Sequence, residues 1–149
     1  MKINTKYHGE VEIEQKDVIS FDFGIPGFPD EKEYVILPLA KESVFFILQS
    51  FKTEELAFII SDPFIHFSEY QFDIPIDDLE TLKIEQKEDV VTFSIITLVE
   101  PIEETTANLQ APLLINRNIN KGKQLILNDT LYSTKHRIYR KKSSTGQEG

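Results

Sequence analysis

Polar and apolar residues alternate along the start of the chain. Between residues 2 and 7, and again between residues 10 and 14, lysine, asparagine or glutamate alternates with isoleucine, threonine, tyrosine or valine. A period of two predicts strands with one face in the core and the other in water. His8-Gly9 separates the two runs, so the pattern predicts a β-hairpin with a turn at this glycine. Residues 17–21 predict a short third strand.

Three later segments, Tyr34–Leu37, Val44–Leu48 and Ala57–Ile60, are continuously apolar rather than alternating. They are rich in β-branched and aromatic residues, which is typical of strands covered on both faces. A longer strand is predicted over Val90–Val99, where apolar residues alternate with Thr92 and Ser94. The phase of this alternation changes at Ile95-Ile96, which predicts a β-bulge.

Turn residues divide the last third of the chain. Residues 113–118 and 124–127 flank Asn120-Lys121-Gly122, which predicts a hairpin whose glycine supplies a positive φ. Asn128-Asp129 predicts a second tight turn. Many short strands separated by turns are typical of an antiparallel sandwich or barrel. Together with the bulge, they favour a mainly β, single-domain antiparallel β-barrel-like fold.

Helical signals are few. Asp77 with Glu80 three residues later has the pattern of a capping box, so we expect one or two short helices in the whole chain. Residues 22–30 contain two glycines and two prolines in nine positions and cannot form a regular element. Because Phe23, Ile25 and Phe28 in this loop are apolar, we expect the loop to plug one end of the barrel.

Charge is unevenly distributed over the chain. The formal net charge is −9, but residues 135–149 hold five basic residues and one acid, so residues 1–134 hold eleven basic and 24 acidic residues and carry −13. An acidic body repels phosphate, which argues against direct nucleic-acid binding, and attracts basic proteins. We expect residues 1–138 to form one β-barrel domain and residues 139–149 a basic, polar, disordered tail.

Composition also limits location and chemistry. No apolar run reaches the roughly 20 residues of a membrane helix, and no signal peptide is recognisable. We therefore expect a cytoplasmic protein. Without cysteine there is no disulfide, thiolate nucleophile or Cys-ligated zinc.

Candidate catalytic residues form no motif. His8, His66 and His136 are scattered, HExxH is absent, and no Gly-x-Ser-x-Gly elbow occurs. Pairs of acids are plentiful and suit solvated faces. We expect no enzyme, no cofactor and no metal. A metal-dependent cupin-like enzyme would require the three histidines to converge in space. A small-ligand-binding barrel would require a deep closed cavity of several hundred Å3.

One stretch, residues 105–116, combines a polar start with a compact apolar end. Pro112 suits the first residue of a strand, and Ala111 before it is driven towards extended geometry. We interpret the stretch as a loop that presents Asn108 and then enters a buried strand, Leu113 to Ile115. Asn108 would bond its own backbone in a turn. The alternative is that the segment frames a partner-binding edge.

Several motifs together resemble one known family. They are Phe23-Gly24-Ile25-Pro26-Gly27-Phe28, Ser61-Asp62-Pro63-Phe64, and Thr106-Ala107-Asn108-Leu109-Gln110-Ala111-Pro112-Leu113-Leu114-Ile115-Asn116, followed by Gln124-Leu125-Ile126-Leu127 and Tyr132. In this order and spacing they resemble the flagellar assembly factor FliW family of bacteria, from Lys2 to about Ile138. The positions that match the family pattern and are candidates for a role are Phe28, Asn108, Leu109, Pro112 and Asn116.

The resemblance implies a β-rich barrel-like fold and a cytoplasmic regulator with two protein partners. Members of the family bind newly made flagellin before export. They also bind the RNA-binding translational regulator CsrA and so relieve its repression of flagellin mRNA. We expect no cofactor, no direct nucleic-acid or membrane contact, and a monomer when the protein is free.

Two sets of residues are candidates for the two partner surfaces. A basic regulator would face acids, for which the candidates are Glu31, Glu33, Asp73, Asp77, Asp78, Glu103 and Glu104. The amphipathic terminal helices of flagellin would suit an apolar groove with a polar rim. The candidates for that groove are Phe45, Phe46, Phe64, Phe67, Tyr70 and Phe72.

Overall fold

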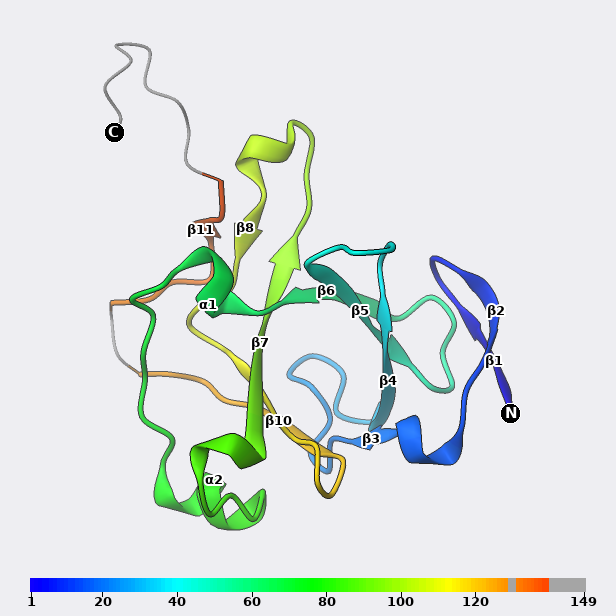
Figure 1. Cartoon of the computed structure of the whole chain (residues 1–149), viewed down its shortest axis with the longest axis horizontal. Coiled ribbons are helices and arrows are strands. Elements are labelled where there is room, and N and C mark those ends of the chain that lie inside the picture. Colours follow the sequence, from blue (N-terminus) through cyan, green and yellow to red (C-terminus); the bar gives the residue numbers. More distant parts are fainter. Residues whose placement is uncertain (129–130, 140–149) are drawn as a thin grey trace.

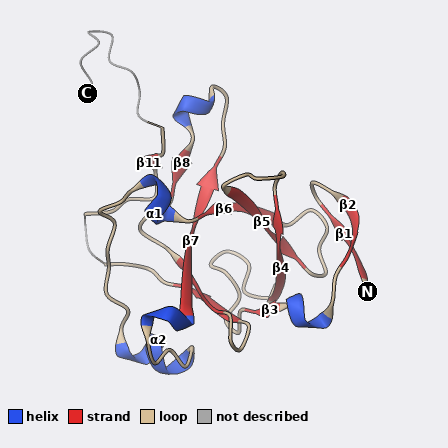
Figure 2. Cartoon of the chain, in the orientation of Figure 1, coloured by secondary structure: helices blue, strands red, loops and turns tan. Residues whose placement is uncertain are grey.

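The computed structural model describes residues 1–128 and 131–139 (Figure 1). Strands dominate these residues, and the helices are short (Figure 2). The strands are β1 (Lys2–Thr5), β2 (Gly9–Glu12), β3 (Ile19–Ser20), β4 (Glu33–Pro38), β5 (Phe45–Ser50), β6 (Ala57–Ser61), β7 (Val90–Thr97), β8 (Thr106–Ala107), β9 (Leu113–Asn116), β10 (Lys121–Gln124) and β11 (His136–Arg137). The α-helices are α1 (Pro63–His66) and α2 (Ile76–Thr81), and single 3-10 turns cover Gln15–Asp17, Lys87–Asp89 and Ile102–Glu104.

Strand pairing closes the large sheet into a ring. The order β7-β6-β5-β4-β3-β10-β9 returns to β7, because β9 pairs with β7 along Val90–Phe93. β8 and β11 branch from the other end of β7. The predicted mainly β, barrel-like fold is confirmed. Its pairings are antiparallel except between β3 and β10, where Ser20 and Lys121 are parallel partners.

Side chains fill the interior of the ring. Tyr34, Leu48, Ile60 and Leu113 are each 0% exposed and pack in one cluster with buried residues of β3, β9 and the loop after β3. Full burial of side chains of this size contributes about 1.5–3 kcal/mol each. The small-ligand alternative depends on a deep closed cavity, and this filled interior gives it no support.

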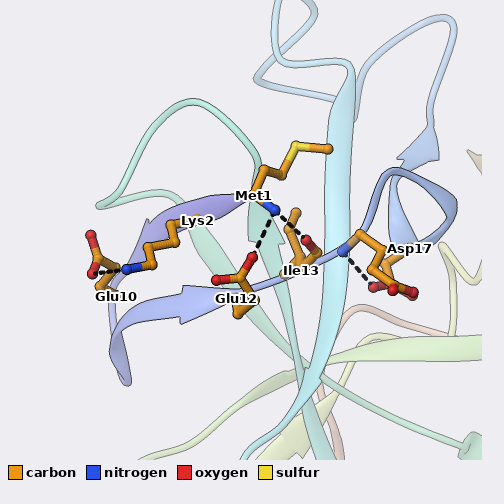
Figure 3. A network of polar contacts seen from close by, with 7 residues as sticks. Met1, Lys2, Glu10, Glu12, Ile13 and Asp17 are labelled. Atoms are coloured by element: carbon orange, nitrogen blue, oxygen red, sulfur yellow. Dashed lines mark hydrogen bonds and ion pairs between the residues drawn. The ribbon is translucent and has the colours of Figure 1, made fainter.

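The predicted N-terminal hairpin is confirmed. Ile3 pairs with Val11, the turn covers residues 6–8, and Gly9, with φ +65°, is the first residue of β2. Figure 3 shows the polar contacts around it: the amino group of Met1 lies 2.8 Å from a carboxylate oxygen of Glu12, and Lys2 lies 3.9 Å from Glu10. These pairs are exposed, so packing of the hairpin on the barrel contributes more to stability than the charges do.

The change of phase in β7 has a different cause from the predicted bulge. Ile59, Ile60 and Ser61 face Ile96, Ile95 and Ser94 in unbroken register. Ile95 packs against the barrel interior, whereas Ile96 belongs to a second buried cluster on the other side of the sheet. The bulge prediction is wrong, because this end of β7 is covered by apolar residues on both faces.

Gly122 is also not in a turn. The hairpin between β9 and β10 turns at residues 117–120, and Asn120 has the positive φ of 53°. Gly122 lies inside β10, where a Cβ atom would come within 2.6 Å of the Phe21 ring. This glycine is therefore required for close packing and not for turn conformation.

The expected plug is formed by one residue of the loop. Ile25 is 1% exposed and packs in the barrel interior, whereas Phe23 is 68% and Phe28 is 41% exposed. Gly24 has φ +68°, and a Cβ there would meet backbone atoms of Phe28 and Pro29 within 2.7 Å. The loop turns so tightly that only its central isoleucine enters the core.

The helix near Asp77 exists, but the predicted capping box does not. α2 begins at Ile76 with Pro75 as N-cap, and no side chain caps it. The second tight turn was predicted at Asn128-Asp129, and Asp129 lies outside the described residues. Of the predicted tail, only Tyr139 lies within them.

Candidate functional site

The aromatic segment after β6 begins with a short helix that the sequence signals missed. The Asp62 carboxylate accepts a hydrogen bond of 2.8 Å from the Phe64 N–H, and Pro63 occupies the first helical turn. Asp at the N-cap with Pro directly after it favours helix initiation. This cap turns the chain so that the aromatic side chains of residues 64–72 gather on one side of the barrel.

Tyr70 is the centre of this aromatic cluster. Its ring centroid lies 4.8 Å from that of Tyr132, 5.3 Å from Phe72 and 5.6 Å from Phe64. Its hydroxyl donates a hydrogen bond of 2.8 Å to the carbonyl of Leu109. Burial raises the pKa of Tyr70 well above its ordinary value, so the hydroxyl stays protonated and keeps this bond.

Two surface cavities lie beside Tyr132. One, of about 650 Å3, extends towards His66 and His136, and the other, of about 500 Å3, extends towards Pro75 and Leu127. Gln71, Leu131 and Tyr132 line both. We call the two cavities together the aromatic groove; its lining residues are 66–73, Pro75, Leu109, 125–128, Leu131, Tyr132 and His136.

The candidate aromatic residues divide between this groove and the core. Phe67, Tyr70 and Phe72 line the groove. Phe64 packs beside Tyr70, and Phe45 stacks on His66 with 6.1 Å between ring centroids.

Phe46 points the other way. Its ring lies 6.2 Å from Phe93 and packs against the barrel interior. Neighbouring residues of a strand face opposite sides of a sheet, so Phe46 belongs to the core and not to the groove.

The candidate acids do not gather on one face. Glu33 begins β4, Asp77 lies in α2, and Glu103 and Glu104 lie in the 3-10 turn between β7 and β8. In Figure 1 these sites are at the right, bottom and top of the molecule. Asp73 is exposed and lines the aromatic groove.

Two of the candidate acids are engaged inside the protein. Asp78 is 7% exposed and forms an ion pair with Lys123 of β10. Glu31 accepts hydrogen bonds from the hydroxyls of Ser50, at 2.7 Å, and Thr53, at 2.8 Å. These bonds lower the pKa of Glu31. Both carboxylates therefore have partners within the same chain that hold elements of the fold together.

Among the family-signature positions, Leu109 lines the groove, and Asn108 and Pro112 lie close to it in the chain. The Asn108 side chain accepts hydrogen bonds from the backbone N–H groups of Gln110 and Ala111, so its interpretation as a turn former is confirmed. Leu109 is 1% exposed, and Pro112 is buried.

Asn116 and Phe28 join other parts of the fold. The Asn116 amide donates to the Leu82 carbonyl at 2.7 Å and so ties β9 to the end of α2. Phe28 packs edge-to-face on Phe58 at 5.8 Å.

Each histidine has its own partner. His8 contacts the Pro38 carbonyl, and the His136 ring accepts from the Ser133 N–H at 2.8 Å. His66 lies 3.0 Å from the Ser61 hydroxyl, the spacing of a nucleophile and its base. Ser61 is 0% exposed and also donates to the Val44 carbonyl, so the pair is structural. In the described part of the chain, no group of three or more metal-ligating side chains occurs.

The closed barrel with an amphipathic groove on its outer side defines a protein-binding β module. The sequence profile of the family described as "FliW protein" matches residues 2–138. The flagellar assembly factor FliW of Bacillus velezensis is 53% identical over 138 residues, which cover 93% of this chain and 96% of that protein. The FliW of Bacillus subtilis is 48% identical over the same shares of both chains.

A solved structure agrees with these relatives. A crystal structure of the flagellar assembly factor FliW matches with a TM-score of 0.91 at 46% identity and covers 96% of this chain and 100% of that chain. The chain belongs to the FliW family of flagellar assembly factors. Among the residues that the structure describes, no helix is both long and apolar enough to cross a membrane.

Proposed function

We propose that this protein is a cytoplasmic regulator that binds flagellin and, when free of flagellin, binds CsrA and relieves its repression of flagellin mRNA translation. The observation that carries the proposal is the match of residues 2–138 to the FliW family. The chain is also 53% and 48% identical to two flagellar assembly factors of that family. The role is one of binding and requires no catalysis.

The aromatic groove supports the flagellin half of the proposal. Its lining combines aromatic and aliphatic residues with polar residues such as Gln71 and Glu69. An amphipathic helix buries an apolar face in a groove of this kind and keeps its polar face in water. Ile126, 55% exposed, and Leu131, 73% exposed, offer apolar surface for such a helix at the groove.

The net negative charge of the chain supports the part of the proposal that concerns CsrA. Residues 1–134 carry a net charge of −13, which attracts a basic RNA-binding protein. The same charge repels the phosphates of the RNA that competes for that protein. The potential acts over about 10 Å at moderate salt, so the acids weaken RNA binding without covering the RNA site.

A pull-down from cytoplasmic extract tests the whole proposal. The tagged protein should retain flagellin and CsrA and should retain no nucleic acid. Excess flagellin should release CsrA into the unbound fraction. Retention of neither protein would refute the proposed function.

A pair of isoleucine variants tests the groove separately. Ile126→Ser removes apolar surface from the groove, whereas Ile119→Ser, at the β9–β10 turn, removes a similarly exposed isoleucine elsewhere. We expect the first variant to weaken flagellin binding about tenfold, as apolar interface residues commonly do, and the second to bind normally. Equal affinities in calorimetry would place flagellin elsewhere.

A further inference from the structure

A projection leaves the barrel between β7 and β8. Residues 98–104, which we call the β7–β8 projection, form the excursion at the top of Figure 1. The pairing of Thr97 with Thr106 closes its base. The hydroxyl of the fully buried Thr105 accepts a hydrogen bond from the Val99 N–H, and the Thr105 N–H donates to the Ile102 carbonyl. The fold therefore holds this excursion in a defined shape.

Apolar and acidic side chains share its surface. Leu98, Val99 and Ile102 are 40%, 38% and 48% exposed. The three acids beside them, Glu100, Glu103 and Glu104, are exposed, and none forms an ion pair with any described residue. The N-terminal hairpin differs in this respect, because Glu10, Glu12 and Glu14 all have cationic partners there.

Exposed apolar residues bordered by exposed charges have the composition of an interface with an apolar centre and a polar rim. The sign of the charges selects the partner. A second copy of this chain is itself acidic and would be repelled. A protein with a basic surface beside an apolar strip would be attracted and would cover exposed apolar surface of the projection.

We infer that the β7–β8 projection is the docking element for the basic RNA-binding partner, CsrA, and this inference rests on the proposed function. The three glutamates face lysines and arginines of the partner and speed its association. The three apolar residues are buried on contact and slow its dissociation. The projection and the aromatic groove are separate surfaces for separate partners.

Two variants separate these contributions. Glu100→Lys/Glu103→Lys/Glu104→Lys should slow association with purified CsrA by about 10- to 100-fold at low salt, because steering is lost, and the difference should shrink as salt rises. Leu98→Ser/Ile102→Ser should raise the dissociation rate by about tenfold at every salt concentration. Surface plasmon resonance measures both rates.

A charge-matched control lies at the opposite end of β7. Glu80→Lys/Glu85→Lys/Glu88→Lys changes exposed acids in and after α2. Each substitution adds two charges, so this triple variant and the projection variant both move the formal net charge from −9 to −3. The control should associate nearly as fast as the wild type. Circular dichroism confirms that all variants are folded.

Each other outcome overturns a particular statement. If the wild type binds CsrA and the projection variants bind equally well, the docking site is wrong while the proposed function stands. Equal losses in projection and control variants would show that net charge alone matters. Loss of flagellin binding in place of CsrA binding would assign the projection to flagellin. If the wild type does not bind CsrA, the proposed function itself fails.

Discussion

Asn116 should stabilise the protein strongly although it belongs to the family signature. It is 2% exposed, and its amide donates to the carbonyls of Leu82 at 2.7 Å and Lys83 at 3.3 Å. Its side-chain oxygen accepts from the Asn118 N–H at 2.9 Å. These three bonds tie β9 to the end of α2 and to the β9–β10 turn. Asn116→Ala removes all of them at once.

The loss of stability in Asn116→Ala depends on which of the groups that lose a hydrogen bond can be reached by water. Lys83 and Asn118 are exposed, so water replaces the lost partner of each. Leu82 is 2% exposed, so its carbonyl stays buried and unpaired. One unsatisfied buried acceptor, with lost packing, costs about 2–3 kcal/mol. For a domain of this length, that lowers the melting temperature by about 5–10 °C.

Urea unfolding followed by far-UV circular dichroism measures this difference, since the chain has no Trp to report by fluorescence. Asn118→Ala is the matched control, because its exposed side-chain amide donates to the exposed end of the Asp89 carboxylate and to no buried group of the described residues. It should cost less than about 0.5 kcal/mol. Folded Asn116→Ala should bind both proposed partners normally. Unchanged stability combined with lost binding would refute the scaffold role.

Three further changes test other parts of the structure. Gly122→Ala places a Cβ against the Phe21 ring and should destabilise by about 1–3 kcal/mol in urea unfolding; no loss would contradict the close packing. Asp78→Ala leaves Lys123 without its ion-pair partner and should cost more than Asp78→Leu/Lys123→Met, which removes both charges; the reverse order would refute the pairing. The lowered pKa of Glu31 stabilises the folded state above the ordinary carboxyl pKa of 4.5, and this stability is lost as pH falls through the lowered value. The melting temperatures of wild type and Glu31→Gln should therefore converge between neutral and acid pH, and parallel curves would contradict the pKa shift.

Strand positions were largely predictable from the sequence, because alternation and continuous apolar runs directly reflect which faces are buried. Features that depend on a distant contact were not. Gly122 was assigned to a turn, yet its need for glycine comes from Phe21 about a hundred residues earlier. The short helix at Pro63–His66 carries no apolar periodicity, and its only local signal is Asp at the N-cap followed by Pro.

The candidate site was predictable on one side only. Aromatic density in residues 64–72 indicated one wall of the groove, but the other wall comes from residues 125–128, Leu131, Tyr132 and His136 and has no local signal. One error was avoidable: Phe45 and Phe46 are neighbours in a strand, so they cannot line the same groove. The wide separation of the candidate acids could not be predicted without the topology, because the charge of a segment does not say where that segment lies in space.

Closure of the ring between β3 and β10 has a consequence for synthesis of the protein. Ser20 pairs with Lys121, and β7 pairs with β9, so the barrel cannot close until most of the chain has left the ribosome. Contacts between such distant residues form slowly because a long loop must close first. At about 5–20 residues per second of synthesis, the early strands wait several seconds with their apolar faces uncovered. A nascent chain of this assembly factor therefore exposes apolar strand faces until its last third has been made.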